Sequence, residues 1–174
     1  MSKELPSWSE LTSQLIDLVE IRLLDPLEIL LESRSDLSLV RSRVAERAGA
    51  WAQALLGEDE HLARFTAIRL VSTLYPGDHG FNPPPGWWQT PLGQVMVRRV
   101  GHPAAEAVSY AVAGAMLGIT RQGVHDLVTR GKLDRHESGG VTTDSVQRRI
   151  TSSDARETRR PRAPREEASS ESRE

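Results

Sequence analysis

The chain contains no cysteine. Disulfide bonds, thiolate metal sites and cysteine nucleophiles are therefore excluded. Aromatic residues make up only 5% of the chain and apolar residues only 38%. A chain of 174 residues is long enough for one ordinary domain or two small ones, but with so little apolar content part of it is expected to stay outside a packed core.

Long apolar runs are also missing. No stretch approaches the roughly 18 consecutive apolar residues that a membrane span needs. The first ten residues, MSKELPSWSE, lack a basic segment followed by an apolar run, so no signal peptide is expected. The sequence predicts a soluble protein of the cytoplasm without a membrane partner.

Patterns of catalytic residues are absent as well. The five histidines never fall at a metal-ligand spacing such as HExxH. The chain has no Gly-rich phosphate loop, no nucleophile elbow and no paired carboxylates. Asp78-His79-Gly80 is the one suggestive group, and a turn uses the same residues for structural reasons. We therefore expect no enzyme, no cofactor and no metal site.

The net charge of −2 hides an uneven distribution. Residues 1–75 hold 8 Lys and Arg against 12 Asp and Glu, residues 76–150 hold 8 against 6, and residues 151–174 hold 6 against 6. Phosphate would repel the acidic first part. Any contact with nucleic acid is therefore expected in the second half of the chain.

Residues 1–75 carry helix signals throughout. Ser7-Trp8-Ser9-Glu10 is a capping box, Asp25-Pro26 is a second helix start, and Gly57 ends a longer helix. We expect the longer helix to bury Val40, Val44, Ala48, Trp51, Ala52 and Leu55, and the next helix to carry Leu62, Phe65, Ile68, Val71, Leu74 and Tyr75. This pattern predicts an acidic helical bundle that forms a homodimer or binds a protein partner.

Residues 76–108 are expected to form a connector and a helix. The stretch PGDHGFNPPPGWWQT cannot be helical, because three consecutive prolines and three glycines favour extended or turning backbone. We expect Trp87 and Trp88 to plug the edge of a core rather than to bind a ligand. The helix that follows ends in Arg98 and Arg99, interpreted as a charge pair at the helix end.

Residues 151–174 contain no Leu, Ile, Val or aromatic residue and are rich in Ser, Arg, Glu and Pro. Such a segment cannot bury enough apolar surface to offset the cost of ordering. We therefore expect a disordered tail. It includes the basic patch RRPRAPR at 159–165, flanked by acids.

Residues 109–133, SYAVAGAMLGITRQGVHDLVTRGKL, carry the most chemical information. Ser109 is a good N-cap for a helix over 110–117, Gly118 suits the end of that helix, and Thr120 caps a second one. The sequence thus predicts two short helices around a glycine turn, which is the arrangement of a helix-turn-helix.

The second helix, over 120–130, has two chemically different sides. Its apolar side holds Val124, Leu127 and Val128, and its polar side holds Arg121, Gln122, His125 and Thr129. Arg can pair with guanine O6 and N7, and Gln with adenine N6 and N7, each giving about 1–3 kcal/mol of discrimination. Arg121, Gln122 and His125 are therefore the candidate base contacts, although a solvated surface histidine explains His125 equally well.

A family resemblance rests on the same segment. Its residues are Ser109, Ala113, Leu117-Gly118-Ile119-Thr120-Arg121, Val124, Leu127 and Arg130-Gly131-Lys132-Leu133. This pattern resembles the helix-turn-helix of excisionases and of the MerR superfamily, and the resemblance covers residues 109–150. MerR regulators place the motif first in the chain, and some carry metal-sensing cysteines that this chain lacks, so metal sensing is not implied.

The resemblance implies both structure and roles for the residues that follow. A short β-wing is compatible with Leu133–Glu137 and Val141 around Ser138-Gly139-Gly140, before a helix capped by Thr142 or Thr143. The residues implied to face bases are Arg121, Gln122 and His125, and those implied to contact the DNA backbone are Thr120, Thr129, Arg130, Lys132 and Arg135.

We expect a mainly all-α protein with an N-terminal bundle, a C-terminal helix-turn-helix and an optional short β-wing. The leading functional hypothesis is sequence-specific binding of double-stranded DNA by a small transcriptional regulator, which reads the major groove with helix 120–130. Two alternatives stay open. One is an excisionase-like factor for recombination or for plasmid or phage maintenance, and the other is a protein–protein adaptor in which the helical hairpin only packs.

Overall fold

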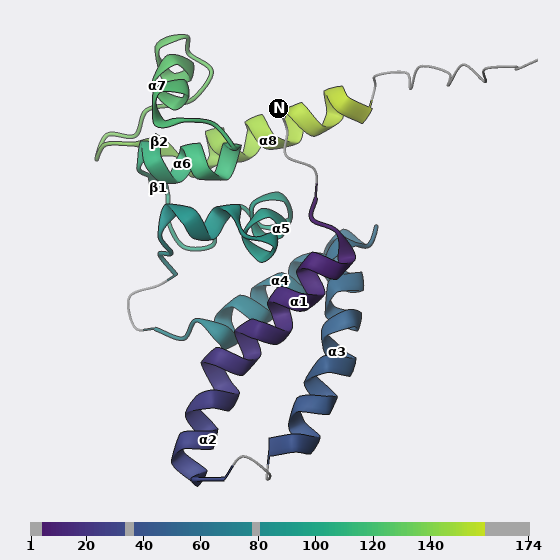
Figure 1. Cartoon of the computed structure of the whole chain (residues 1–174). Helices are drawn as coiled ribbons and strands as arrows, with labels where there is room; N and C mark the ends of the chain where they lie inside the picture. Colours follow the sequence, from purple (N-terminus) through teal and green to yellow (C-terminus); the bar gives the residue numbers. More distant parts are fainter. Residues whose placement is uncertain (1–4, 34–36, 78–80, 159–174) are drawn as a thin grey trace, which may run out of the picture.

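The structure, a computed structural model, describes residues 5–33, 37–77 and 81–158, with side chains described up to residue 152 (Figure 1). Most of these residues are helical, and two short strands form a two-stranded sheet. The expected all-α class is confirmed. Within this part of the chain no helix combines the length and the apolar content that crossing a membrane requires.

The chain begins with one long helical rod. α1 (Trp8–Val19) continues without a break into a π-helical turn, η1 (Glu20–Leu24), and then into α2 (Asp25–Leu31). The expected capping box starts α1. Ser7 Oγ accepts the Glu10 N–H at 3.2 Å, and the Glu10 carboxylate accepts the Ser7 N–H at 2.9 Å.

The rod runs straight through the second helix start predicted at Asp25-Pro26. Leu24, directly before that signal, has helical backbone angles. Pro26 has no N–H to donate to the preceding turn. The helix widens there into a turn in which the Asp25 N–H bonds to the Glu20 carbonyl, five residues back. The proline thus alters the helix instead of starting a separate one.

α3 (Ser38–Leu56) packs against α1, and α4 (Glu60–Leu74) packs against α3. In α3, Ala48 and Leu55 are buried as expected, but Val40 is 43% exposed. The buried residues of α4 are Ala63, Thr66, Ala67, Leu70, Val71 and Leu74, and its exposed apolar residues are Leu62, Phe65 and Ile68. The α4 helix therefore has two apolar sides, and the side with small alanines is the one that packs.

One arginine joins the rod to α3. Arg41 Nε donates to Glu20 Oε1 at 2.7 Å, and Arg41 Nη2 donates to Glu28 Oε2 at 2.6 Å. These hydrogen bonds, that to Glu20 first, raise the pKa of the Arg41 guanidinium above its usual value. A single cation between two anions thus ties the start of α3 to η1 and α2.

The proline-rich segment leads into a short 3₁₀ helix, η3 (Pro85–Gln89), in which both tryptophans are buried. Trp87 Nε1 donates to the Tyr75 hydroxyl at 2.8 Å, and Trp88 is only 1% exposed. The Phe81 ring meets both indoles edge to face, with centroids 4.8 and 6.1 Å away. The expectation that these tryptophans plug a core is confirmed.

The last residue of α5 (Pro91–Arg99), Arg99, bonds to the N-terminal bundle. Arg99 Nε donates to the Leu55 carbonyl at 3.1 Å, and Arg99 Nη2 donates to the Gly57 carbonyl at 2.8 Å. The same guanidinium pairs with Glu60. Arg99 thus satisfies carbonyls at the end of α3 that have no partner within the helix, whereas the sequence predicted a role at the end of its own helix.

The remaining elements are β1 (Ala107–Val108), α6 (Tyr110–Leu117), α7 (Arg121–Thr129), β2 (Val141–Thr142) and α8 (Thr143–Thr158). One continuous buried cluster runs from Leu11 in α1 to Ile150 in α8, so the bundle, the connector and the C-terminal elements share a core. α8 also continues into the segment expected to be disordered, because extending an existing helix costs little. The rest of that expected tail, 159–174, lies outside the described residues.

Gly93 tests the packing of α5 on the tryptophan pair. A Cβ at this position would lie 2.1 Å from the Trp87 carbonyl oxygen and 2.8 Å from Trp88 Cα. Because backbone atoms cannot move aside as a flexible side chain does, we expect Gly93→Ala to lower the free energy of unfolding by about 1–3 kcal/mol. The measurement is urea unfolding followed by tryptophan fluorescence.

Gly86→Ala is the matched control, since a Cβ at Gly86 would meet nothing within 4 Å. It should change the free energy of unfolding by less than about 0.5 kcal/mol. Equal stability of the two variants would contradict this packing.

Candidate nucleic-acid interface

α6 and α7 form the predicted pair of helices around a glycine turn. Ser109 Oγ accepts the Val112 N–H at 3.3 Å and starts α6. Gly118 ends that helix with a φ of 68°, in the left-handed region that favours glycine. Thr120 Oγ1 then accepts the Gly123 N–H at 3.1 Å and starts α7. All three signals lie where the sequence places them.

Close packing fixes the position of α7 relative to α6. A Cβ on Gly114 would lie 2.8 Å from the Ile119 carbonyl oxygen, so the turn rests directly against α6. Val124 is fully buried, and the partly buried Leu127 and Val128 pack against the same core. One side of α7 is therefore held by the protein, while its opposite side faces outward.

The polar side of α7 is the exposed one. Arg121, Gln122 and His125 all have exposed side chains. The His125 ring also lies edge-on to the Tyr110 ring of α6, with the centroids 6.4 Å apart. In Figure 1, α7 lies at one end of the molecule and α2 at the other. The structure thus brings the three candidate base contacts together on one exposed helix side.

Asp126 adds a carboxylate to this side that sequence reasoning missed. Gln122 Nε2 donates to Asp126 Oδ1 at 3.2 Å, and His125 Nδ1 lies 3.9 Å from the same oxygen. The available signal was the spacing, since side chains four residues apart meet on a helix. The contact orients the Gln122 amide and leaves its Oε1 and one Nε2 proton free for another partner.

The two threonines proposed for the DNA backbone already make hydrogen bonds within the protein. Thr120 accepts a backbone N–H as the N-cap of α7, which leaves its hydroxyl proton available. Thr129 Oγ1 donates to the His125 carbonyl at 3.0 Å. Thr129 would have to give up this bond before it could donate to a phosphate.

Arg130 and Lys132 are exposed where α7 ends. Gly131, with a φ of 63°, turns the chain between them, and the Lys132 N–H bonds to the Leu127 carbonyl at 2.8 Å. This turn places both cations beside the last turn of α7.

In place of the two expected wing strands, residues 133–141 form a turn closed by a single antiparallel bridge, and we call this hairpin the wing. Arg135 forms an antiparallel bridge with Val141, and the His136 N–H bonds to the Gly140 carbonyl at 3.2 Å. The side chain of Arg135 is exposed. On the other side, β1 pairs Val108 with Val141, a strand that the sequence did not indicate. A Cβ on Gly140 would lie 2.2 Å from the Val108 carbonyl oxygen, so this pairing requires glycine there.

α8 supports the wing from behind. Thr142 is the cap, since its Oγ1 accepts the Ser145 N–H at 3.3 Å. Val146 is fully buried in the shared core. Arg148 pairs with Asp134, which lies directly before the bridging residue of the wing. Helix α8 thus anchors the hairpin to the rest of the molecule.

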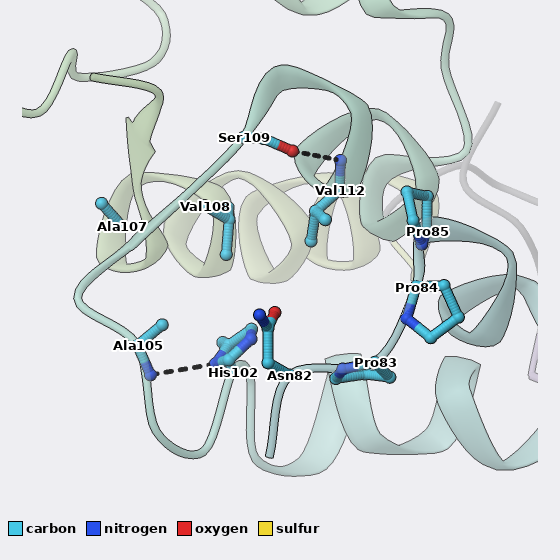
Figure 2. A pocket seen from close by; sticks show the side chains of 10 residues that line it. All are labelled: Asn82, Pro83, Pro84, Pro85, His102, Ala105, Ala107, Val108, Ser109 and Val112. Carbon is cyan, nitrogen blue, oxygen red and sulfur yellow. Dashed lines mark hydrogen bonds between the residues drawn. The ribbon is translucent and has the colours of Figure 1, made fainter. Parts of the chain in front are cut away.

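A groove of about 460 Å³ lies between the connector and the start of α6 (Figure 2). Its walls include Asn82, the prolines at 83–85, His102 and Ser109. His102 Nδ1 accepts the Ala105 N–H at 3.0 Å, and burial lowers the pKa of the imidazole. Neutral His102 therefore holds the loop that leads into β1.

No group of three or more His, Asp or Glu side chains that could hold a metal ion occurs among the described residues. Comparison with protein-family models, with curated proteins and with solved structures finds no match for this chain.

His102 is expected to make stability depend on pH. Since burial lowers its pKa in the folded state, the unfolded chain, with an imidazole pKa of about 6.5, takes up a proton first. The contribution of His102 is therefore complete above about pH 6.5 and declines as the pH falls toward the lowered folded-state pKa. Between about pH 7.5 and 5.5, we expect the melting temperature of His102→Asn to fall less than that of the wild type.

The exposed His61 supplies the control for this measurement. Over the same pH range, the melting temperature of His61→Asn should fall as much as that of the wild type. If all three proteins showed the same pH dependence, the role of His102 would be wrong.

Proposed function

We propose that this protein binds double-stranded DNA in a sequence-specific manner, with α7 in the major groove. The supporting observation is the division of α7 into two sides. Val124 and the turn at Gly118 hold one side against the core, while Arg121, Gln122 and His125 are exposed on the other. A helix held in this way can enter the groove at a fixed angle.

The exposed side chains have the chemistry that base recognition uses. Arg121 opens α7, where recognition helices contact bases most, and can pair with guanine. Gln122 can pair with adenine, and its hydrogen bond to Asp126 orients the amide before DNA arrives. His125 lies one turn further along and can donate or accept a hydrogen bond.

Contacts to the DNA backbone are assigned to residues around α7. Arg130 and Lys132 follow the helix, and Arg135 projects from the wing, so each can neutralise a phosphate. Thr120 can donate its free hydroxyl proton, and Thr129 can do so after releasing His125. The acidic bundle extends away from α7, which keeps its negative charge from the phosphates (Figure 1).

A DNA-binding helix of this kind fits a small transcriptional regulator best. One recognition helix reads only a few base pairs, so two copies at neighbouring half-sites increase specificity. We therefore propose a homodimer, joined through the N-terminal helices. The cytoplasm is the compartment we propose for such a regulator.

The experiment that tests this function is selection of bound sequences from random duplex DNA with the purified chain at physiological salt. Enrichment of one motif is the expected result, and its symmetry would report two half-sites. Footprints over tandem repeats would instead indicate an excisionase-like role. Failure to enrich any motif would overturn the proposal and favour a protein adaptor.

Arg121→Ala is expected to weaken binding to the selected duplex about 5- to 150-fold, the equivalent of one bidentate base contact. It should also relax the preference at one base pair. Arg64→Ala is the matched control, because Arg64 is an exposed arginine of α4, outside the proposed interface. Fluorescence anisotropy measures both variants. Unchanged affinity and preference in Arg121→Ala would contradict readout by α7.

Lys132→Ala should behave differently from Arg121→Ala. Since a phosphate contact carries no sequence information, binding to all duplexes should weaken by the same factor. The slope of log affinity against log salt concentration should become shallower by about one unit. A salt titration on selected and unrelated duplexes provides the measurement. A loss confined to the selected duplex would mean that Lys132 contacts a base.

A further inference from the structure

The end of the bundle opposite α7 carries an unusual amount of exposed apolar surface. In α2, no side chain is buried, and Ile29 and Leu30 are 76% and 77% exposed. The exposed apolar side chains at this end are Leu27, Ile29, Leu30, Leu31, Leu39 and Val40, which we call the apolar tip. Beyond Ile68, the described residues include no large apolar side chain that is exposed. Six of the twelve exposed large apolar side chains of the described residues belong to the apolar tip, and a group of this kind is typical of an interaction surface.

The two helices that carry the apolar tip are tied together. Arg41 joins the start of α3 to Glu20 and Glu28, at 2.7 and 2.6 Å. Beneath the surface, Leu24 and Leu37 are buried in one small core cluster. The end of α2 and the start of α3 are therefore held together at this end of the molecule.

The charges around the apolar tip match those of a second copy. Residues 25–32 hold three acids and no base, whereas residues 38–47 hold three arginines against one glutamate. Within one copy Arg41 already pairs with Glu28, and Arg43 pairs with Glu46. Apart from these pairs, the first segment has a net charge of −2 and the second a net charge of +1. In a twofold dimer the same contact occurs twice, once from each copy. If the acidic segment of one copy met the basic segment of the other, this favourable contact would therefore form twice.

The direction of the chain suits the same arrangement. The rod runs toward the tip through α2, and α3 runs back from it (Figure 1). A twofold axis along this hairpin would set α2 of one copy antiparallel to α3 of the other, as in a four-helix bundle. Both copies of α7 would then lie at the same end of the dimer.

We propose that the apolar tip is the surface through which two copies of this chain associate, with α2 of each copy packed on α3 of the other. The choice of a second copy rests in part on the proposed function, since a reader of a few base pairs needs two half-sites. The interface buries the apolar tip and leaves the polar side of α7 free for DNA.

The test uses the full chain in analytical ultracentrifugation over a range of concentrations. The wild type should be a dimer, and the double variant I29Q/L30Q should raise the dimer dissociation constant roughly 30-fold or more, as loss of a central anchor does. L39Q tests the same surface from α3 and should also weaken the dimer. A wild-type chain that stays monomeric would overturn the proposal.

F65Q is the matched control, because Phe65 is an exposed apolar residue of α4, away from the apolar tip. It should remain a dimer. Dissociation by F65Q, with I29Q/L30Q and L39Q still dimeric, would overturn the proposal and move the interface to α4. The circular dichroism spectrum of I29Q/L30Q should be unchanged, since the replaced side chains lie in solvent in the monomer, while its melting temperature should fall because the variant loses the stabilisation that association gives the folded chain.

Salt and DNA separate the remaining outcomes. Dimerisation should weaken at high salt, because opposite charges meet across the interface, and a dissociation constant that did not rise would overturn the pairing of α2 with α3.

On a single half-site I29Q/L30Q should bind like the wild type, but on the full selected site it should lose roughly 100-fold in affinity or more. A dimer that enriches no DNA would defeat the proposed function alone, and a monomer that enriches a motif would defeat this inference alone.

Discussion

The packing of the Trp87–Trp88 pair is the contact on which the rest of the structure depends. Trp87 reaches back to the Tyr75 hydroxyl at the end of α4, and η3, which holds both tryptophans, packs against α5 and α6. Since bulky aromatic rings bury large apolar areas, this short segment links the bundle to the helix pair. Without it, the proline-rich stretch would be a loose linker between two small helical units.

This link determines how α7 is presented. A helix pair on a flexible tether would lose orientational freedom on binding, whereas one that shares a core with the bundle is already oriented. Arg99 strengthens the same junction by bonding to carbonyls at the end of α3. The wing hairpin and α8 hold the other side of the pair, through Val141 and Val146 in the core. The proposed DNA reader is therefore one face of a rigid body.

The two ends of the molecule differ in charge balance and in exposed apolar surface. Residues 76–150 have an excess of basic over acidic residues, and the large apolar side chains among the described residues after Ile68 are turned inward. The first 75 residues have the opposite charge balance and keep apolar side chains such as Leu30 and Leu39 outside. Phosphate suits the first kind of surface and another protein surface suits the second. This division supports the proposal that the protein contacts DNA at one end and another protein surface at the other.

By itself, the sequence determined the local signals, because each involves residues within a few positions of one another. The capping box at Ser7, the turn at Gly118 and the cap at Thr120 could all be predicted, and with them the polar side of α7. Only the tertiary structure decided which of the two apolar sides of α4 is buried and that β1 pairs with β2. These features depend on contacts between segments far apart in the chain, where the neighbour that covers a surface decides its role and local propensity does not.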